Sequence, residues 1–376
     1  MQGNKIIFCT KCVTPSTRPR INFNKDFICN ACLNSKEKNN IDWKNRQIEF
    51  EDILSKYRSN KGEWDCVVPW SGGKDSSSIA WKLKFKFKMN PLLVTFSPIL
   101  PTTIGNLNRE SLLEAGFDNY LFRSNQLIHR KLAKRFFIER ANPKVAWDAG
   151  INVVPVQIAL KYNIKLIFYA EHGESEYGGK VLSEESKKSR NFTEVLEHQI
   201  GDDPRNWIDE EISISDLNPY IYPNIDEIES NNIKAYYFAY YNKWNAKDNY
   251  DFIKEKINFR LEPSGRTCGT FTNYDSLCDK FDDLYYYMMY IKFGFGRCIR
   301  DCSRWIQNDM MTRNEAIELC KKYDGEFPSK NLDHVLDYLD LDMKEMNNII
   351  DLHRNKEIWK LNKSNKSKYE LSIKLK

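Results

Sequence analysis

The sequence predicts an α/β protein with a parallel sheet covered by helices on both faces, a small four-cysteine unit before it and a helical region after it. Two C-x-x-C pairs lie within the first 32 residues. From residue 63 to about residue 200, short apolar runs alternate with stretches of helical spacing, which is typical of βαβ units around a parallel sheet. Beyond residue 200 the spacing of apolar residues is mostly helical.

Composition and charge are those of an ordinary globular chain. Of 376 residues, 41% are hydrophobic and 29% are charged. No apolar run approaches the roughly 18 residues that a membrane span needs. The net charge of +5 is small for this length and argues against a nucleic-acid partner. The N-terminus lacks the apolar segment and cleavage site of a secretory signal, so we expect a cytoplasmic protein without a membrane partner.

The first candidate site is the cysteine pattern Cys9, Cys12, Cys29 and Cys32. Two such pairs can supply four thiolates to a tetrahedral zinc ion and leave no position for water, which indicates a structural site. Residues 1–40 have few aliphatic side chains, so metal binding would provide the folding energy of this unit. A rubredoxin-like iron site uses the same ligands, and four buried thiols without metal are the other alternative.

A linking helix is expected next, over residues 41–60. The spacing places Ile48, Ile53, Leu54 and Tyr57 on one side of this helix. An Asn-Lys-Gly sequence at residues 60–62 ends it.

A strand at residues 65–70, a glycine-rich turn and a helix from residue 76 to about residue 88 follow in direct succession. The turn reads SGGKDS over residues 71–76. Backbone N–H groups and the helix dipole at such a junction favour an anion, and the glycines let the backbone approach a phosphate closely. An ordinary βα turn is the alternative. The sequence is not a Walker A loop, which needs G-x-x-x-x-G-K-[ST].

The hexapeptide resembles the PP-loop, SGGxDS, of the ATP pyrophosphatases. This resemblance implies an adenine nucleotide α-hydrolase-like fold and a loop that grips the β- and γ-phosphates of ATP, with Mg²⁺, while the α-phosphate is attacked. It also implies that adenine contacts the strand expected at residues 92–96. The implied ATP-binding residues are Ser71, Gly72, Gly73, Lys74, Asp75, Ser76, Thr95 and Phe96.

Further strands are expected at residues 152–158 and 165–170, and an acidic loop, EHGESEYGGK, follows the second of these over residues 171–180. Ligands of open α/β sheets bind beyond the carboxyl ends of the strands. The loop's carboxylates and glycines are therefore candidates for binding sugar hydroxyls, Mg²⁺ or an incoming amine, and a solvated acidic loop is the alternative. The expected roles are substrate or ammonia handling by Glu171 and Glu176, and substrate binding by Gly173, Tyr177 and Gly178.

A cationic segment, KFGFGRCIRDCSR, occupies residues 292–304. Arg297 and Arg300 are candidates for recognition of phosphate or carboxylate, and a solvated basic helix face is the alternative. Cys298 and Cys302 lie four residues apart on one helix face, and we expect them to be packing residues. A capping box at residues 312–315 starts another helix, and a last helix is expected over much of residues 333–361.

The motifs together resemble the N-acetyl sugar amidotransferases, which are bacterial enzymes similar to the pseudaminic acid, legionaminic acid and O-antigen amidotransferases. The resemblance covers residues 5–330 and rests on the cysteine ribbon, SGGKDS, E-x-G-x-x-E-Y-G-G, K-F-G-F-G-R and T-R-x-E-A-I-x-L-x-x-x-Y-D-G-E-F-P. It implies that the N-acetyl group of a nucleotide-activated sugar, such as a nonulosonic acid of flagellin glycosylation or lipopolysaccharide, becomes an acetamidino group.

The implied chemistry transfers AMP to the amide oxygen, after which ammonia displaces AMP. Lys74, Asp75, Glu171 and Glu176 are the expected catalytic residues. The chain contains no recognisable glutaminase segment, so we expect ammonia from a separate glutaminase subunit, accompanied by a cyclase-like subunit. The alternatives are a tRNA-modifying PP-loop enzyme of the thiolase or lysidine synthetase type, and a zinc-ribbon binding module on an inactive nucleotide-binding domain.

These expectations divide the chain into five segments. They are a zinc ribbon at 1–40, a linking helix at 41–62, a PP-loop ATP-binding α/β domain at 63–200, a mostly helical substrate-site region at 201–330, and a helical C-terminal tail at 331–376.

Overall fold

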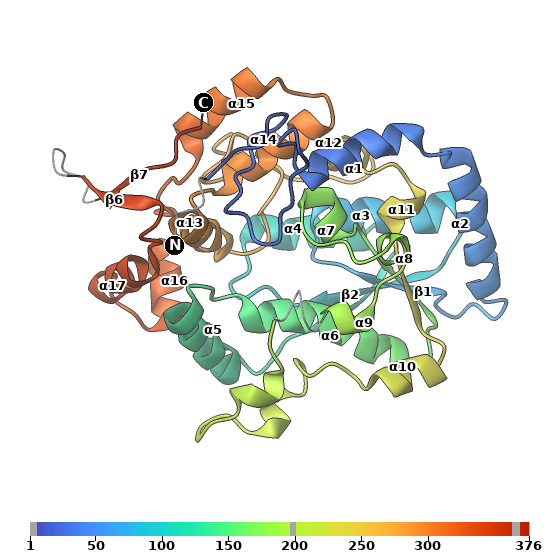
Figure 1. The fold of residues 1–376 in the computed structure, drawn as a ribbon. Helices are drawn as coiled ribbons and strands as arrows, with labels where there is room; N and C mark the ends of the chain where they lie inside the picture. Colours follow the sequence, from blue (N-terminus) through green and yellow to red (C-terminus); the bar gives the residue numbers. More distant parts are fainter. Residues whose placement is uncertain (1–5, 196–200, 363–368, 376) are drawn as a thin grey trace.

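A parallel sheet lies at the centre of the computed structural model, which describes residues 6–195, 201–362 and 369–375 (Figure 1). Within these residues, five strands form the sheet in the order β3-β2-β1-β4-β5, and all neighbours run parallel. The strands are β1 (Cys66–Pro69), β2 (Pro91–Phe96), β3 (Asp118–Phe122), β4 (Leu166–Tyr169) and β5 (Lys234–Tyr237).

Helices precede, separate and follow these strands. The α-helices are α1 (Asn30–Glu37), α2 (Trp43–Tyr57), α3 (Lys74–Trp81), α4 (Thr103–Leu113), α5 (Gln126–Arg140), α6 (Val145–Lys161), α7 (Gly173–Tyr177), α8 (Glu184–Lys188), α9 (Phe192–Val195), α10 (Ile225–Ser230), α11 (Phe238–Tyr241), α12 (Ala246–Lys254), α13 (Asp282–Phe293), α14 (Arg297–Gln307), α15 (Arg313–Tyr323), α16 (Leu332–Leu339) and α17 (Met343–His353). Shorter elements are the 3-10 helices η1 (Lys38–Asn40), η4 (Pro204–Trp207) and η5 (Ile214–Leu217), and the π-helical turn η2 (Lys82–Lys86).

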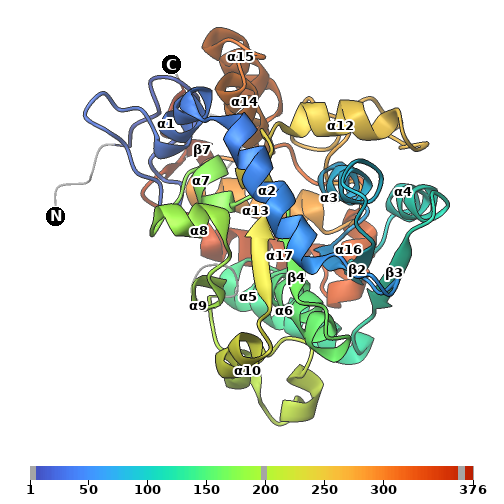
Figure 2. The ribbon, with the colours of Figure 1, turned by 90° about the vertical axis from the view of Figure 1, so that its right-hand side faces the viewer.

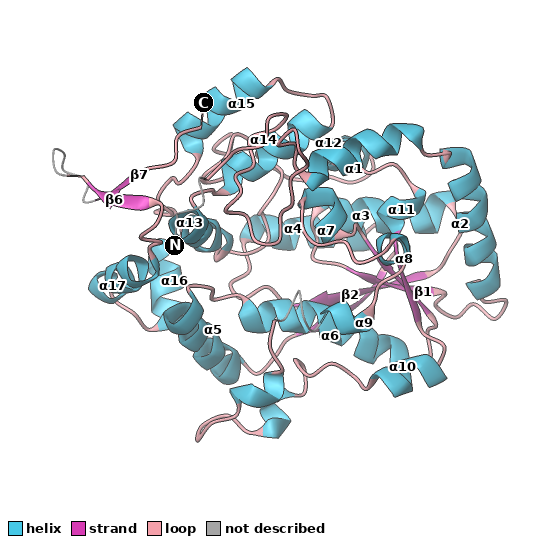
Figure 3. Cartoon of the chain, viewed as in Figure 1, coloured by secondary structure: helices cyan, strands magenta, loops and turns pink. Residues whose placement is uncertain are grey.

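Both faces of the sheet are buried, because successive side chains of a strand point to opposite faces. Val67 of β1 joins the core that α5 and α6 cover, whereas Cys66 and Val68 join the core that α2 and α3 cover. Figure 3 shows the strands between α6 on one side and α3 on the other. The expected α/β class, with a parallel sheet between helices, is confirmed.

The run at residues 152–158 is helical, so the strand expected there is wrong. These residues lie inside α6, a helix that is apolar on nearly all sides and includes Pro155. A short, continuous apolar run does not distinguish a buried strand from a buried helix. Two strands of the parallel sheet, β3 and β5, were not expected from the sequence, and β5 pairs with β4 although it lies beyond residue 200. The sheet therefore continues past the boundary expected for the α/β domain.

The linking helix is present as α2, but its buried stripe differs from the expected one. Phe50, Ile53 and Leu54 are buried, whereas Ile48 is 52% exposed. The Phe50 ring contacts four other rings between α2 and the sheet, those of Phe87, Phe168, Phe238 and Tyr241.

The C-terminal part begins with the expected capping box, in which Thr312 and Glu315 exchange hydrogen bonds at the start of α15. The last helix is in fact two helices, α16 and α17, because Asp340 adopts a left-handed conformation between them. Beyond α17, the strands β6 (Trp359–Leu361) and β7 (Tyr369–Leu371) pair in antiparallel fashion, so the end of the expected helical tail is a hairpin. In the described part of the chain, no helix combines the length and apolarity needed to span a bilayer.

The stripe on α2 gives a stability prediction with a matched control. Phe50→Ala should lower the free energy of unfolding by about 3–5 kcal/mol, because it removes a fully buried ring from a packed cluster. Ile48→Ala on the same helix should change it by less than about 0.5 kcal/mol. Denaturant unfolding of the three proteins provides the measurement, and equal losses in both variants would contradict this packing.

Candidate active site

A cavity of about 470 Å³ lies at the carboxyl ends of the central strands, and the glycine-rich loop (residues 71–76) forms one wall of it. Gly72 has a φ of +89°, and a Cβ atom there would lie 2.4 Å from Cγ of Arg109, so a larger residue would be strained. Gly73 is the N-cap of α3, and no side chain among the described residues caps the first turn. The loop therefore presents a helix N-terminus to the cavity, where an anion is favoured.

Lys74 of the glycine-rich loop lies almost fully buried, with only 2% of its surface exposed. Its Nζ donates to Oδ2 of Asp75 at 2.7 Å and to Asp275. Burial opposes the charge on Lys74, but the carboxylates of Asp275 and Asp75 together raise its pKa above the ordinary range. A Lys74 substitution would leave Asp275 buried without this partner, so it tests stability as well as function.

The strand β2 contributes Phe96 but not the Thr95 side chain. Val94 and Phe96 line the cavity, whereas Thr95 points to the other face of the sheet, as the two-residue period requires. The Thr95 hydroxyl is fully buried and donates to the carbonyl oxygen of Trp70 at 2.7 Å. Of the two residues expected to contact adenine, only Phe96 therefore offers its side chain to the cavity.

Only two residues of the acidic loop, Glu171 and Tyr177, line the cavity. Tyr177 donates its hydroxyl hydrogen to Oε1 of Glu171. Burial, followed by the nearby carboxylate of Asp75, raises the pKa of Glu171 to about 7. A carboxyl group with a pKa near neutrality suits proton transfer at physiological pH.

The other members of the acidic loop contact structural neighbours. Glu176 is paired with Lys38 of η1 at 2.5 Å, and it does not line the cavity. Gly173 begins α7, also outside the cavity wall. Gly178 has a φ of +82° and packs against the N-terminal segment, where its carbonyl oxygen accepts a hydrogen bond from Nε of Arg18 at 2.9 Å. Of the two glutamates expected to handle substrate or ammonia, only Glu171 therefore lines the cavity.

The part of the cavity lining that α14 provides is cationic. Arg297, Arg300 and Arg304 of α14 all line the cavity, so Arg304 joins the two arginines expected from the sequence. The Arg304 guanidinium lies 3.8 Å from the centre of the Tyr177 ring, and its buried Nε has no hydrogen-bond partner among the described residues. Burial, together with Arg300 and Arg304, lowers the pKa of Arg18 to about 10. This concentration of positive charge favours an anionic ligand.

Asp275 is a site residue that the sequence did not reveal. Asp275 accepts a hydrogen bond from Lys74, and its Oδ2 atom lies 3.5 Å from Nη2 of Arg297. Asp275 therefore connects the glycine-rich loop to α14. Burial raises the pKa of Asp275, but Lys74 and Arg297 overcome this and hold it well below the usual range. No local motif marks this residue, because its role depends on two partners that are distant in the sequence.

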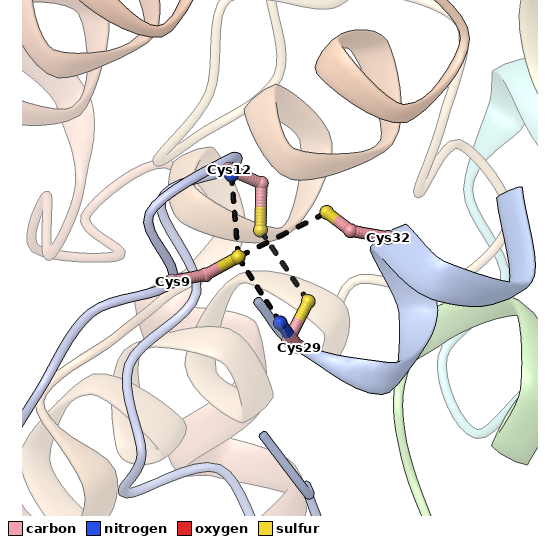
Figure 4. A group of neighbouring side chains, drawn as sticks. All are labelled: Cys9, Cys12, Cys29 and Cys32. Atoms are coloured by element: carbon pink, nitrogen blue, oxygen red, sulfur yellow. Dashed lines mark hydrogen bonds between the residues drawn. The ribbon is translucent and has the colours of Figure 1, made fainter. Parts of the chain in front are cut away.

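The four N-terminal cysteines meet at one point, as the sequence predicted (Figure 4). All four are buried, with Sγ–Sγ distances of 4.0 Å between Cys9 and Cys32 and 3.7 Å between Cys12 and Cys29. Four thiolates about 2.3 Å from a tetrahedral ion lie about 3.8 Å apart. Backbone N–H groups of Cys12 and Cys29 also point at Cys9 Sγ. The group can therefore hold a zinc ion.

This cysteine unit contacts both the acidic loop and α14. Thr14 donates to the hydroxyl oxygen of Ser303 on α14 at 2.9 Å. Asn30 donates to the carbonyl oxygen of Gly179, and Arg313 donates to that of Cys12. The unit thus connects two walls of the cavity that are more than 100 residues apart in the chain.

The comparisons with known proteins concern parts of the chain. Residues 268–376 match a family model described as "LPS biosynthesis protein WbpG-like, C-terminal domain", and this segment includes the arginines of α14. An uncharacterized protein of Methanocaldococcus jannaschii is 38% identical over 87 residues, which are 23% of this chain and 31% of that protein. The chain thus spans less than half of this relative's length. The family match supports a role in LPS or sugar biosynthesis.

The raised pKa of Glu171 predicts a pH-dependent stability difference. The folded chain holds this proton with a pKa of about 7, against a reference value of 4.5. The free energy of unfolding of the wild type should therefore fall as the pH rises through about 7. Glu171→Gln has no proton to release there and should not show this fall. The variant should be more stable at pH 8, by up to about 3 kcal/mol, and the gain should vanish near pH 4. Thermal unfolding at both pH values measures it, and a pH-independent difference would contradict it.

The cysteine cluster predicts a loss of metal on substitution. Cys29→Ser removes one of four ligands and should abolish stoichiometric zinc binding at this cluster, because the unit lacks a core to preform it. Elemental analysis of freshly purified protein gives the metal content. Cys66→Ser, at a buried cysteine outside the cluster, is the control and should retain the metal.

Proposed function

We propose that the chain is an ATP-dependent amidotransferase that converts the N-acetyl group of a sugar, in free or nucleotide-activated form, to an acetamidino group. The observation that carries this proposal is the joining, in one cavity, of an anion-favouring glycine-rich loop, a carboxyl group with a pKa near 7 and a cationic wall. The match of residues 268–376 to an LPS biosynthesis family supports a sugar substrate.

The loop would bind ATP as a PP-loop. The N-terminus of α3 faces the cavity and would stabilise the negative charge that grows on pyrophosphate as it leaves. Asp75 is the loop carboxylate that would hold Mg²⁺, which supplies further charge neutralisation when bound. Lys74 would keep the loop in place through its two carboxylate partners, and Phe96 would contact adenine.

The reaction has two steps on the amide group of the substrate. The amide oxygen attacks the α-phosphate of ATP, a P–O bond to pyrophosphate breaks, and an O-adenylated amide forms. Ammonia then adds to the amide carbon and AMP leaves, so that C–N replaces C–O. Glu171 would accept a proton from the incoming nitrogen, because it lines the cavity and burial raises its pKa to about 7.

Substrate and ammonia would reach the site from different sources. The arginines of α14 would bind a carboxylate or phosphate of the sugar substrate, as expected for a nonulosonic acid or a nucleotide sugar. A separate glutaminase subunit, together with a cyclase-like subunit, would supply ammonia.

The direct test uses the purified chain with ATP, Mg²⁺ and ammonium chloride. A panel of N-acetylated sugars and nucleotide sugars is compared with total tRNA as the acceptor. We expect AMP and pyrophosphate only with a sugar acceptor, together with a product in which mass spectrometry detects NH in place of oxygen. Pyrophosphate release with tRNA alone would support the tRNA-modifying alternative and contradict the proposal, as would absence of release with every acceptor.

Two variants of the acidic loop separate function from structure. Glu171→Gln should lower amidine formation by about 10²–10⁴-fold, while calorimetry shows unchanged ATP binding. Glu176→Gln should keep near-wild-type turnover, because this side chain pairs with Lys38 outside the cavity. Equal activity of both variants and the wild type would remove the acidic loop from the reaction.

A further inference from the structure

Three cysteines gather between α14 and α15, away from the N-terminal cluster. Cys298 and Cys302 lie on one face of α14, four residues apart, and Cys320 lies on α15. The three Sγ atoms lie within 4.8 Å of one another, and all three side chains are buried. Figure 2 shows the two helices side by side, with α1 of the cysteine unit next to them. The sequence predicted packing for the first two residues and gave no reason to connect them with Cys320.

The spacing of the sulfur atoms fits ligands of a single metal ion. Cys298 Sγ and Cys302 Sγ are 3.8 Å apart, far beyond the roughly 2.05 Å of a disulfide, and all three residues are free thiols. Thiolates about 2.3 Å from one tetrahedral ion lie about 3.8 Å apart. The N-terminal cluster has matching distances of 3.7 and 4.0 Å. In a [4Fe–4S] cluster each thiolate would bind a different iron, and the sulfur atoms would lie farther apart.

We propose that Cys298, Cys302 and Cys320 bind one thiophilic d¹⁰ metal ion, Zn²⁺ or Cu⁺. Soft thiolate ligands select these two ions, and neither changes oxidation state on binding. Each thiol that becomes a ligand releases its proton to solvent. Among the described residues, no fourth Cys, His, Asp or Glu belongs to the group, so any fourth position on zinc belongs to water or another small ligand.

This site would fix the helix that forms the cationic wall. The face of α14 opposite the cysteines carries Arg297, Arg300 and Arg304, which line the cavity. A metal bound to both helices would lock α14 against α15 and keep these guanidinium groups in register with the glycine-rich loop. The inference concerns the metal and does not depend on the proposed reaction.

Metal counting on the full-length chain tests the site. The wild type should contain two ions per chain, one in each cluster, by elemental analysis for zinc, copper and iron. Cys302→Ser and Cys320→Ser should each contain one ion, Cys29→Ser should retain the other, and Cys302→Ser combined with Cys29→Ser should contain none. Cys268→Ser, at a partly exposed cysteine outside both groups, is the control and should contain two.

A measurement on the unmodified protein covers the case in which the variants fail to fold. Native mass spectrometry of the folded wild type, expressed in medium with added zinc or added copper, gives the number and identity of the ions. Two ions per chain, with zinc or copper as the second, support the site, and the medium identifies the preferred ion. A single ion, an iron–sulfur cluster, or two ions retained in folded Cys302→Ser would overturn it.

Discussion

A buried series of charges connects the glycine-rich loop to α14, and the candidate site depends on it. Lys74 pairs with Asp275, Asp275 lies beside Arg297, and Arg297 donates from Nε to Asp301 at 2.9 Å. Charges removed from water are costly unless each has a partner of opposite sign. Because loss of one member leaves the next unpaired, the series holds the loop and the helix at a fixed separation.

The cysteine unit provides a second connection between the walls of the cavity. It contacts the acidic loop through Gly178 and Gly179, and it contacts α14 through Ser303. Val13 and Ala31 of the unit pack in one apolar cluster with α14 and α15. A metal ion bound by the four cysteines would further support this side of the cavity. Glu174 and Glu176 maintain the same contacts through Arg20 and Lys38. Most of the acidic loop therefore positions Glu171 and Tyr177, which face inward.

Both carboxyl groups and guanidinium groups line the cavity, and their combination determines which chemistry the site can support. Burial, followed by the nearby carboxylate of Asp75, raises the pKa of Glu171 to about 7. Arg300 and Arg304 lie close enough to Arg18 to lower its pKa, in addition to burial, and a bound anion would reduce this repulsion. A carboxyl group with a pKa near neutrality and a group of arginines thus line one cavity, which is the combination that the proposed reaction on an anionic sugar would use.

The sequence by itself determined the features that depend on short-range backbone preference. The glycine-rich loop between β1 and α3, the capping box at Thr312 and the paired spacing of the N-terminal cysteines follow from adjacent residues, and each is present. The five-stranded order was not accessible in this way. The apolar run in α6 suited either a strand or a helix, and β5 lies beyond residue 200, where the spacing of apolar residues indicated helices.

Only the tertiary structure decided which functional side chains meet. Glu171 and Glu176 are equivalent in the loop sequence, but the turn of α7 directs one into the cavity and the other toward Lys38. Asp275 becomes part of the site because it pairs with Lys74 and Arg297. Cys320 likewise meets two cysteines that lie on another helix. The physical reason is that ion pairs and metal ligands are defined by distances of a few ångströms in space. Residues far apart in the chain reach such distances only after the sheet and its helices have packed.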